Sequence, residues 1–210
     1  MARAYIDRPD RMGPKPTTLL LDVADVVAGT GLRIGEVLAL RWREDVRLEA
    51  VPPVLYVRGT VVEGHGVRKH GQPKPKTATS ERGIEIPPFL VETLRRRKAE
   101  SLGQHALVFE TSSGAPVGPH QVRVQLWKVR DWASTQADQP NIDADVAMHA
   151  LRRGVATVVS DEHDIVVAAK VLGNGQAAIT EKHYAHQQLV VPDVRDTLQA
   201  FGRPQEPRPE

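Results

Sequence analysis

The chain has 210 residues, of which 40% are hydrophobic, 26% charged and 4% aromatic, and its formal net charge is +2. This length and composition are typical of a single soluble globular domain and exclude a chain that is mainly disordered. The lack of any cysteine excludes disulfides, thiolate zinc sites, iron–sulfur clusters and a cysteine nucleophile. No apolar run reaches about 18 residues and charges near Met1 exclude a signal peptide, so we expect a cytoplasmic protein.

The first predicted elements follow an irregular segment at residues 1–16, which we interpret as a leader or linker stump because prolines and glycine interrupt any apolar period. Apolar residues at helical spacing predict one helix over residues 18–28 and another over residues 32–42, separated by Gly29-Thr30-Gly31. Short runs rich in β-branched residues at 54–57, 60–62 and 82–86 then predict a small antiparallel sheet of three strands.

The remainder of the chain is predicted to be helical. Pro87-Pro88 ends the sheet and begins a helix that extends to Leu102, since proline suits a first helical turn. Further helices are predicted over residues 119–136, 144–160, 164–172, 176–184 and 192–201, and the proline-rich tail 202–210 is predicted to be disordered. We therefore expect an α+β fold, mostly α-helical, with one domain over residues 17–201.

The net charge of +2 is too small to indicate nucleic-acid binding by itself, so the distribution of charge is more informative. Basic residues dominate the segment from Arg68 to Arg82, and a second cluster spans Arg95 to Lys98. Each cluster alone is most often a solvated surface.

Arg33 follows a glycine turn at the predicted start of a helix, where the helix dipole is positive and disfavours a cation. A bound anion would relieve this repulsion, and helix starts of this kind bind phosphate through backbone amides and a guanidinium. The alternative is a surface arginine that pairs locally with Glu36.

Two further groups of polar residues lie beside apolar helix faces. His149 and Arg152 are three residues apart and share one helix face, which would combine a proton-transfer group with an oxyanion clamp, or simply form a solvated first turn. The second group is Leu172-Gly173-Asn174 with Tyr184, which is flanked by two histidines. A tyrosine in this setting is usually a core-edge ring, and two histidines without a third ligand do not indicate a metal, so we predict neither metal nor cofactor.

Together these groups occur in an order that resembles the catalytic domain of tyrosine recombinases, the phage-integrase family. The order is an arginine, a basic residue in a hairpin, His-x-x-Arg, a Leu-Gly turn and a tyrosine before the C-terminus. The resemblance covers residues 17–200, and its strongest matches are at residues 30–42, 149–153 and 172–186.

The resemblance implies a mechanism of DNA cleavage and rejoining. Tyr184 would attack the scissile phosphorus to give a 3′-phosphotyrosyl intermediate and a free 5′-hydroxyl, without metal or nucleotide cofactor. Arg33 and Arg152 would stabilise the non-bridging oxygens, and His149 would take or hold the proton of the nucleophile.

The same resemblance assigns the general acid to a hairpin lysine. Lys76 is the first residue of a K-T-x-x-S-x-R-x-I-x-I-P pattern typical of the family and precedes the predicted strand, and Lys74 is the alternative. Arg82 and Glu36 match positions with orienting roles in the family. We also expect the hairpin and the run from Arg95 to Arg97 to contact DNA phosphates with a steep salt dependence. The residues expected to bind DNA are Arg68, Lys69, Lys74, Arg82 and Arg95.

The sequence departs from the family pattern at two points. Asn174 stands where the family normally has histidine or sometimes tryptophan, and this neutral amide predicts slower chemistry. The segment before residue 17 is also too short to supply the N-terminal DNA-binding domain that usually closes around the duplex.

The departures leave two hypotheses. The first is a recombinase or integrase catalytic domain that acts on double-stranded DNA together with other recombinase protomers and without a membrane. The second is a truncated relic that only binds DNA or docks on intact recombinases. A type IB topoisomerase uses similar side chains, but the Leu-Gly turn and the small size disfavour it. The sequence does not indicate the target site or the direction of recombination.

Overall fold

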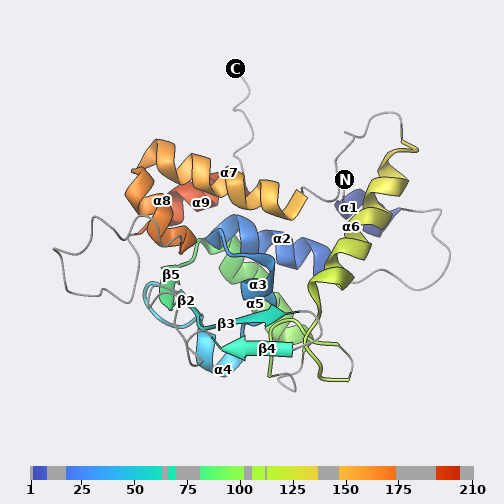
Figure 1. The fold of residues 1–210 in the computed structure, drawn as a ribbon, viewed down its shortest axis with the longest axis horizontal. Helices are drawn as coiled ribbons and strands as arrows, with labels where there is room; N and C mark the ends of the chain where they lie inside the picture. The colour runs from blue at the N-terminus through green and yellow to red at the C-terminus, as the bar shows by residue number, and fades with distance from the viewer. Residues whose placement is uncertain are drawn as a thin grey trace.

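The computed structural model describes residues 2–8, 18–62, 66–69, 81–101, 106–111, 113–136, 147–173 and 193–203. Within these ranges the chain is mostly helical with short antiparallel strands, as expected from the sequence (Figure 1). The elements are α1 (Ala2–Asp7), α2 (Leu19–Thr30), α3 (Ile34–Leu38), α4 (Trp42–Asp45), β1 (Val46–Arg47), β2 (Val54–Val57), β3 (Gly59–Val62), β4 (Gly66–Lys69), β5 (Arg82–Glu85), α5 (Pro88–Glu100), α6 (Pro119–Ala133), α7 (Ala147–Glu162), α8 (Ile165–Leu172) and α9 (Arg195–Gly202).

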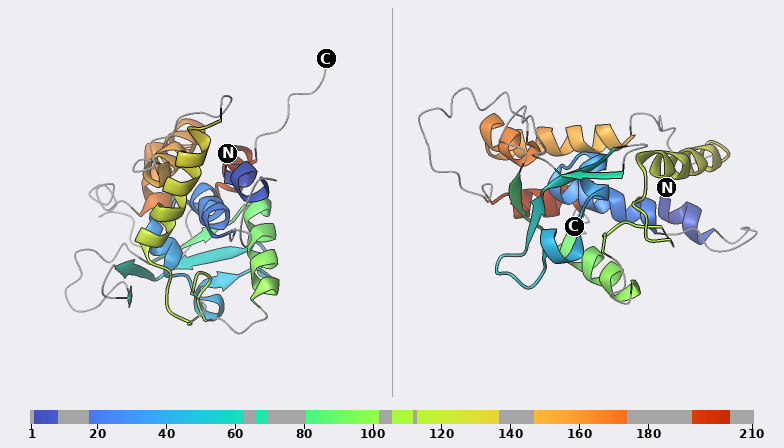
Figure 2. Two further views of the ribbon diagram at one scale, coloured as in Figure 1. Left: turned by 90° about the vertical axis from the view of Figure 1, so that its right-hand side faces the viewer. Right: turned by 60° about the horizontal axis from the view of Figure 1, so that its bottom comes forward.

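Helix α2 lies in the middle of the molecule, and it contacts α1, α3, α5, α6, α7 and α9. Its apolar residues are therefore buried on several faces, with Val23 and Val26 completely inaccessible. Figure 2 shows α6, α7 and α8 along one side of this helix and α5 along the opposite side. The arrangement gives the molecule two distinct faces, which we call the α7 face and the α5 face.

The three-stranded sheet has the order β1-β2-β5, with all neighbours antiparallel. The predicted strand at residues 60–62 does not belong to this sheet: it lies in β3, which pairs with β4 in a separate ribbon, and Val46–Arg47 supplies the third strand instead. Strand β3 leaves the sheet because it packs against α3. Gly35 permits this contact, since a Cβ there would lie 2.5 Å from Thr60 Oγ1 and 2.8 Å from the Val61 carbonyl oxygen.

The predicted helix over residues 32–42 is shorter than expected and is divided into α3 and α4. Its backbone breaks because residues 40–42 bond to a distant segment: the Leu40 carbonyl accepts from the Val108 amide at 2.8 Å, and the Trp42 amide donates to the Ala106 carbonyl at 3.0 Å. Helix α1 forms within the segment expected to be irregular, where Ile6 is buried and Tyr5 meets Trp132 edge to face.

The other predicted helices in the described ranges begin and end within a few residues of the observed ones. The predicted helix at residues 176–184 lies outside the described residues. No described helix has the length and apolar character needed to span a lipid bilayer.

Candidate functional site

The predicted arginines Arg33 and Arg152 converge on one buried carboxylate, that of Glu36, although they come from distant parts of the chain. Arg33 is the residue before α3, Glu36 is in that helix, and Arg152 is in α7. A third arginine, Arg82 of β5, reaches the same carboxylate. The exposed fractions of these side chains are 52% for Arg33, 8% for Arg152, 6% for Arg82 and 4% for Glu36.

Arg33 occupies the N-cap position of α3 with extended backbone, because the left-handed turn at Gly31 (φ 66°) ends α2 just before it. The Arg33 amide donates to Glu36 Oε2 at 2.9 Å, and its Nη1 lies 3.3 Å from Glu36 Oε1. The local ion pair with Glu36 is therefore present. Half of the side chain still faces solvent, so Arg33 can contact an anion while Glu36 holds it.

Arg152 lies almost entirely inside the protein and is held by backbone carbonyls. Its Nη1 donates to the Gly31 carbonyl at 2.5 Å and its Nη2 to the Leu172 carbonyl at 2.9 Å, while Nη1 lies 4.0 Å from Glu36 Oε2. Burial and the positive charge of Arg33 lower the pKa of Arg152 to about 10. The guanidinium thus remains charged at neutral pH in a setting where a second anion would be favourable.

Arg82 fastens the end of α8 to the same cluster. Its Nε donates to the Val171 carbonyl at 2.8 Å, and its Nη2 lies 3.3 Å from both the Leu172 carbonyl and Glu36 Oε2. Gly173 ends α8 with φ 64°, and a Cβ there would lie 2.5 Å from Arg82 Nη1. We expect from the sequence that Arg82 either binds DNA or has an orienting role; its guanidinium is directed inward, toward Glu36 and the end of α8.

Glu36 balances the positive charge of this cluster. Burial alone would raise its pKa, but the charges of Arg82 and Arg33 and the Arg33 amide outweigh burial and lower the pKa below its usual value. Glu36 therefore stays ionised at neutral pH and orients the arginines. We call Arg33, Glu36, Arg82 and Arg152 the arginine–glutamate cluster.

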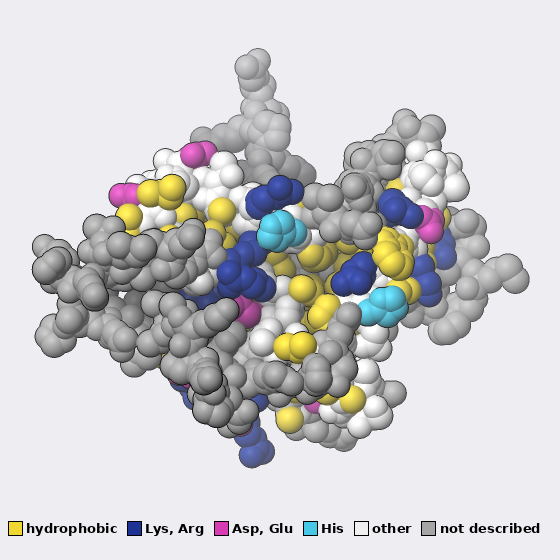
Figure 3. Space-filling model, viewed as in Figure 1, with side chains coloured by type: hydrophobic (Ala, Val, Ile, Leu, Met, Phe, Trp, Pro, Cys, Tyr) yellow, Lys and Arg dark blue, Asp and Glu magenta, His cyan; other side chains and the backbone are white. Residues whose placement is uncertain are grey.

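His149 lies one helical turn before Arg152 on α7, and its side chain is exposed. Figure 3 shows Lys, Arg and His side chains gathered on the α7 face over α3 and the start of α7. The exposed Arg153 belongs to this helix as well. Sequence motifs identified His149, whereas Arg153 gave no separate signal beyond its basic charge.

The other predicted catalytic residues, Lys76, Lys74, Asn174 and Tyr184, lie outside the described residues. For Arg68 and Lys69 the structure describes only the backbone, in strand β4. In the sequence Asn174 directly follows Gly173, and a Cβ at Gly173 would lie 2.5 Å from Arg82 Nη1.

The arginine run of α5, which we expect to contact DNA phosphates, forms ion pairs in the structure. Arg96 pairs with Asp22 of α2, a carboxylate that is 1% exposed, and Arg97 Nη1 lies 2.8 Å from the same side chain. Arg95 pairs at the surface with Glu49 at 3.4 Å. Arg96 and Arg97 therefore anchor α5 to α2. Helix α5 lies on the side of α2 opposite α7 (Figure 2).

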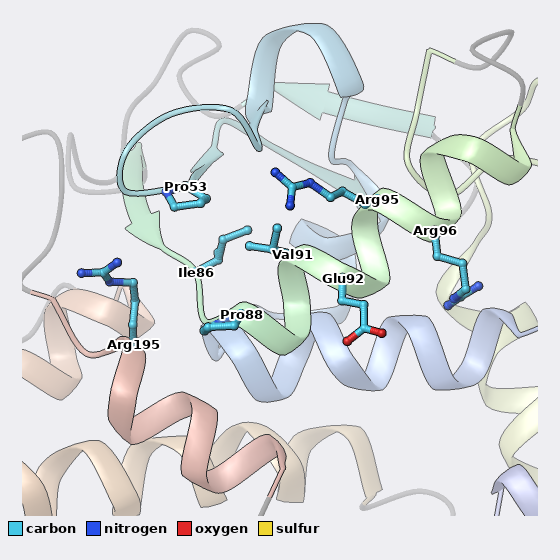
Figure 4. Close-up of a pocket in the computed structure, with 8 residues that line it drawn as sticks. All are labelled: Pro53, Ile86, Pro88, Val91, Glu92, Arg95, Arg96 and Arg195. Atoms are coloured by element: carbon cyan, nitrogen blue, oxygen red, sulfur yellow. The ribbon is translucent and has the colours of Figure 1, made fainter.

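A shallow depression of about 520 Å³ lies on the α5 face, between the end of β5, α5 and the start of α9. Figure 4 shows apolar side chains such as Pro53, Ile86 and Val91 within it and charged side chains at its rim. Of these, Arg195 pairs with Glu85 at 3.3 Å. The depression is separate from the arginine–glutamate cluster and brings no reactive group together.

Among the described residues no group of three or more His, Asp or Glu side chains is arranged to hold a metal ion. The described part of the site holds two guanidiniums, one half-exposed and one buried, that share one carboxylate, an arrangement suited to clamping an oxyanion.

The chain matches no protein-family model, but it is similar in sequence to a curated integrase and in fold to solved recombinase structures. It is 25% identical over 198 residues to the integrase of Staphylococcus phage L54a, an alignment that covers 88% of this chain and 52% of the relative. The chain thus spans about half the length of the curated relative that it matches.

Solved structures share the fold. The Tn1549 transposon integrase in complex with circular intermediate DNA aligns with a TM-score of 0.65 at 18% identity, over 89% of this chain and 60% of that one. The site-specific recombinase XerH bound to its difH substrate aligns with a TM-score of 0.53 at 16% identity, over 86% and 47% of the two chains. The lambda integrase catalytic core aligns with a TM-score of 0.51 at 18% identity, over 82% and 88%. By fold and by sequence, the chain is similar to the catalytic domains of the tyrosine recombinase, or phage integrase, family.

Proposed function

We propose that this chain is the catalytic domain of a site-specific DNA recombinase that cleaves and rejoins DNA through Tyr184. The observation that carries the proposal is the convergence of Arg33 and Arg152 on the buried carboxylate of Glu36. These arginines come from two segments that match the family motifs, and the Leu172 carbonyl that Arg152 binds lies at the end of α8, in the Leu-Gly motif that precedes Tyr184 in the sequence.

The cleavage step that we propose is an exchange of one phosphodiester for another. The Tyr184 phenolic oxygen forms a bond to the scissile phosphorus while the bond from phosphorus to the 5′-oxygen breaks. The phenolic proton passes toward His149, and Lys76 supplies a proton to the leaving 5′-oxygen. Rejoining reverses these steps: a 5′-hydroxyl attacks the phosphotyrosyl phosphorus and releases Tyr184. Because one phosphodiester bond is exchanged for another, the reaction needs no external energy source.

Arg33 and Arg152 act on the charge that develops on the non-bridging oxygens. Each such contact is worth about 10²–10³ in rate when it is made mainly in the transition state. Asn174 can donate an amide hydrogen bond to the same phosphate but carries no charge, which supports a slower reaction than in family members with histidine there. The proposal includes a cytoplasmic location and further recombinase protomers on the DNA.

Asn174 also supports a second candidate, a module that binds DNA through the arginine–glutamate cluster without turning over. Both candidates bind DNA, but only the recombinase cleaves it, so a test has to measure DNA binding and DNA cleavage separately.

The test compares Arg33→Ala with Arg153→Ala, which removes the same charge from an exposed position on α7. At saturating protein, we expect Arg33→Ala to lower the rate of strand cleavage by about 10²-fold or more and Arg153→Ala to leave it nearly unchanged. Equal cleavage by both variants would contradict the catalytic role of the cluster. Binding of DNA by the wild type without any cleavage would favour the binding module.

A further inference from the structure

Helix α3, which begins beside Arg33 and contains Glu36, lies directly against strand β3. The closest approach is at Gly35, a buried residue of this helix. A Cβ at Gly35 would lie 2.5 Å from Thr60 Oγ1 and 2.8 Å from the Val61 carbonyl oxygen. The first atom belongs to a side chain that can rotate, but the second belongs to the backbone of β3. A larger residue in place of glycine would therefore have to push the strand away from α3.

Helix α3 itself gives no reason for a glycine at this position. Glycine is a poorer helix former than alanine, because it loses more backbone freedom on folding. Gly35 is also not among the described glycines with a positive φ, so its backbone conformation is open to any residue. The close approach of β3 is what requires glycine here.

Strand β3 in turn borders the part of the chain that contains Lys76. In the sequence, this segment joins β4 to β5. Lys69, the last residue of β4, pairs with Gly59 of β3. Arg82, the first residue of β5, pairs with Val57 of β2. The two residues that flank the segment are thus held by positions only two residues apart, directly before the contact of β3 with α3.

The second flank of the segment is also attached to α3. Arg82 Nη2 lies 3.3 Å from Glu36 Oε2, and both side chains are buried. One flank is therefore fixed to α3 by this ion pair and the other by the packing of β3 on Gly35. Because Arg33 precedes the same helix, α3 supports both the oxyanion clamp and the segment that contains Lys76.

We propose that Gly35 is a positioning residue for protonation of the leaving 5′-oxygen. By allowing β3 to lie on α3, it sets the distance between Arg33 and the flank of the segment that contains Lys76. The inference rests on the proposed function, in which Arg33 holds the scissile phosphate and Lys76 supplies the proton. A misplacement of about 1 Å can slow a catalysed step by about 10²-fold, so a methyl group that displaces β3 should affect this proton transfer.

The test separates protonation of the leaving group from stabilisation of the phosphate. Two duplexes of one sequence, drawn from the DNA that flanks the gene, carry oxygen or sulfur at the bridging 5′ position of the scissile phosphate. Cleavage of the second duplex breaks the bond from phosphorus to sulfur and releases a 5′-thiolate. This leaving group needs no general acid, because a thiol has a pKa of about 8.5. Single-turnover rates on both duplexes therefore report on proton transfer to the leaving group.

The variants are Gly35→Ala, Lys76→Ala, Arg33→Ala and the control Gly29→Ala. The control also adds a methyl group to a buried helical glycine, but its Cβ would lie 2.8 Å from Leu90 Cδ2 of α5 and not against β3. Thermal unfolding shows which variants fold. If Gly35→Ala does not fold, Val61→Ala takes its place, since Val61 is 6% exposed and its truncation loosens β3 without changing α3.

We expect Gly35→Ala to slow cleavage of the oxygen duplex by about tenfold or more, and that of the sulfur duplex by less than about twofold. Lys76→Ala should show the same pattern. Adding Gly35→Ala to Lys76→Ala should cause little further loss, because both changes act on one step. Arg33→Ala should slow both duplexes, and Gly29→Ala should keep the wild-type ratio of the two rates.

The opposite results would overturn the inference. If Gly35→Ala slows both duplexes by the same factor or slows neither, Gly35 does not position the general acid and the proposed function stands. If its full effect persists in the Lys76→Ala background, Gly35 does not act through that lysine. If the wild type cleaves neither duplex, or Arg33→Ala cleaves both as fast as the wild type, the proposed function fails and the inference fails with it.

Discussion

Replacing Glu36 with glutamine removes one negative charge from the centre of three guanidiniums while keeping the size of the side chain. Glu36 Oε2 accepts from the Arg33 amide at 2.9 Å and lies 3.3 Å from Arg82 Nη2 and 4.0 Å from Arg152 Nη1. The glutamine carbonyl can keep one of these contacts. The charges of Arg82 and Arg152, both more than 90% buried, lose their shared counter-ion.

The structure sets the size of the effect. At 3.3 Å and an effective dielectric constant of about 20, the gross attraction between Arg82 and Glu36 is about 5 kcal/mol, much of which offsets the cost of desolvating both groups. Removing one partner of a buried pair leaves the other uncompensated, and the loss in the free energy of unfolding is then about 3–5 kcal/mol. In a domain of this size, that corresponds to a fall in Tm of roughly 6–20 °C.

The pH dependence distinguishes loss of charge from loss of packing. Because folding lowers the pKa of Glu36 below its usual value of 4.5, the unfolded chain binds the proton more readily. The stabilisation by Glu36 is therefore fully present above pH 4.5 and is lost as the pH falls through its lowered pKa. The difference in unfolding free energy between the wild type and Glu36→Gln should be constant near neutrality and shrink in acid.

Equilibrium unfolding in urea, followed by tryptophan fluorescence at several pH values, measures this difference. Glu49→Gln is the matched control, since Glu49 is 84% exposed and its pair with Arg95 should contribute less than about 1 kcal/mol. Equal stability of Glu36→Gln and Glu49→Gln at pH 7 would refute the role assigned to the carboxylate. So would a difference that remains the same size in acid.

Three further predictions concern neighbouring residues. Gly173→Ala should lower the Tm and slow DNA cleavage, because its Cβ would lie 2.5 Å from Arg82 Nη1 and φ is 64°; thermal melts and a cleavage time course measure both. Asp22→Asn should lower the free energy of unfolding by about 3–5 kcal/mol, since Asp22 is the buried partner of Arg97, and leave DNA affinity unchanged in a filter-binding assay. The Arg152 pKa of about 10 predicts that DNA affinity falls as the pH rises through 10, because the guanidinium loses its charge. The free energy of unfolding should rise between about pH 10 and 12.5, because the unfolded chain still holds the Arg152 proton in that window and the folded chain does not. A pH titration of binding that stays flat through pH 10 would contradict the assignment for Arg152.

Local sequence patterns predicted the observed helices where the helical spacing of apolar residues agreed with residues that begin or end a helix. The period from Leu19 to Ala28 and the Pro87-Pro88 pair at the start of α5 correspond to observed helices. The same reasoning overextended the helix at residues 32–42, because the backbone of Leu40 and Trp42 bonds to a segment more than sixty residues away. Such distant backbone pairing leaves no mark on a local pattern.

The partners of charged residues were the harder part of the site to predict. Basic residues look alike in sequence, but Arg96 and Arg97 are paired with a single buried carboxylate on α2, whereas Arg123 and Lys128 of α6 are exposed and have no carboxylate partner among the described residues. Only tertiary structure distinguishes the two cases.

The resemblance to a family identified Arg33 and Arg152, but it gave no account of how two distant arginines are aligned. Their contacts with Glu36 and with the ends of α2 and α8 supply that account. The orienting role implied for Arg82 has a physical basis in its hydrogen bonds to Val171 and Leu172.

The central claim is that Tyr184 attacks DNA, and covalent trapping tests it most directly. The chain would be incubated with nicked duplexes drawn from the DNA that flanks its gene, so that the cleaved strand diffuses away and the adduct accumulates, and protein–DNA adducts would be resolved on a denaturing gel. The Tyr184→Phe variant keeps the ring and removes the hydroxyl. We predict an adduct for the wild type that maps to Tyr184 and is lost in the variant. An adduct that persists in Tyr184→Phe, or no adduct under conditions where the wild type binds the duplex, would contradict the claim.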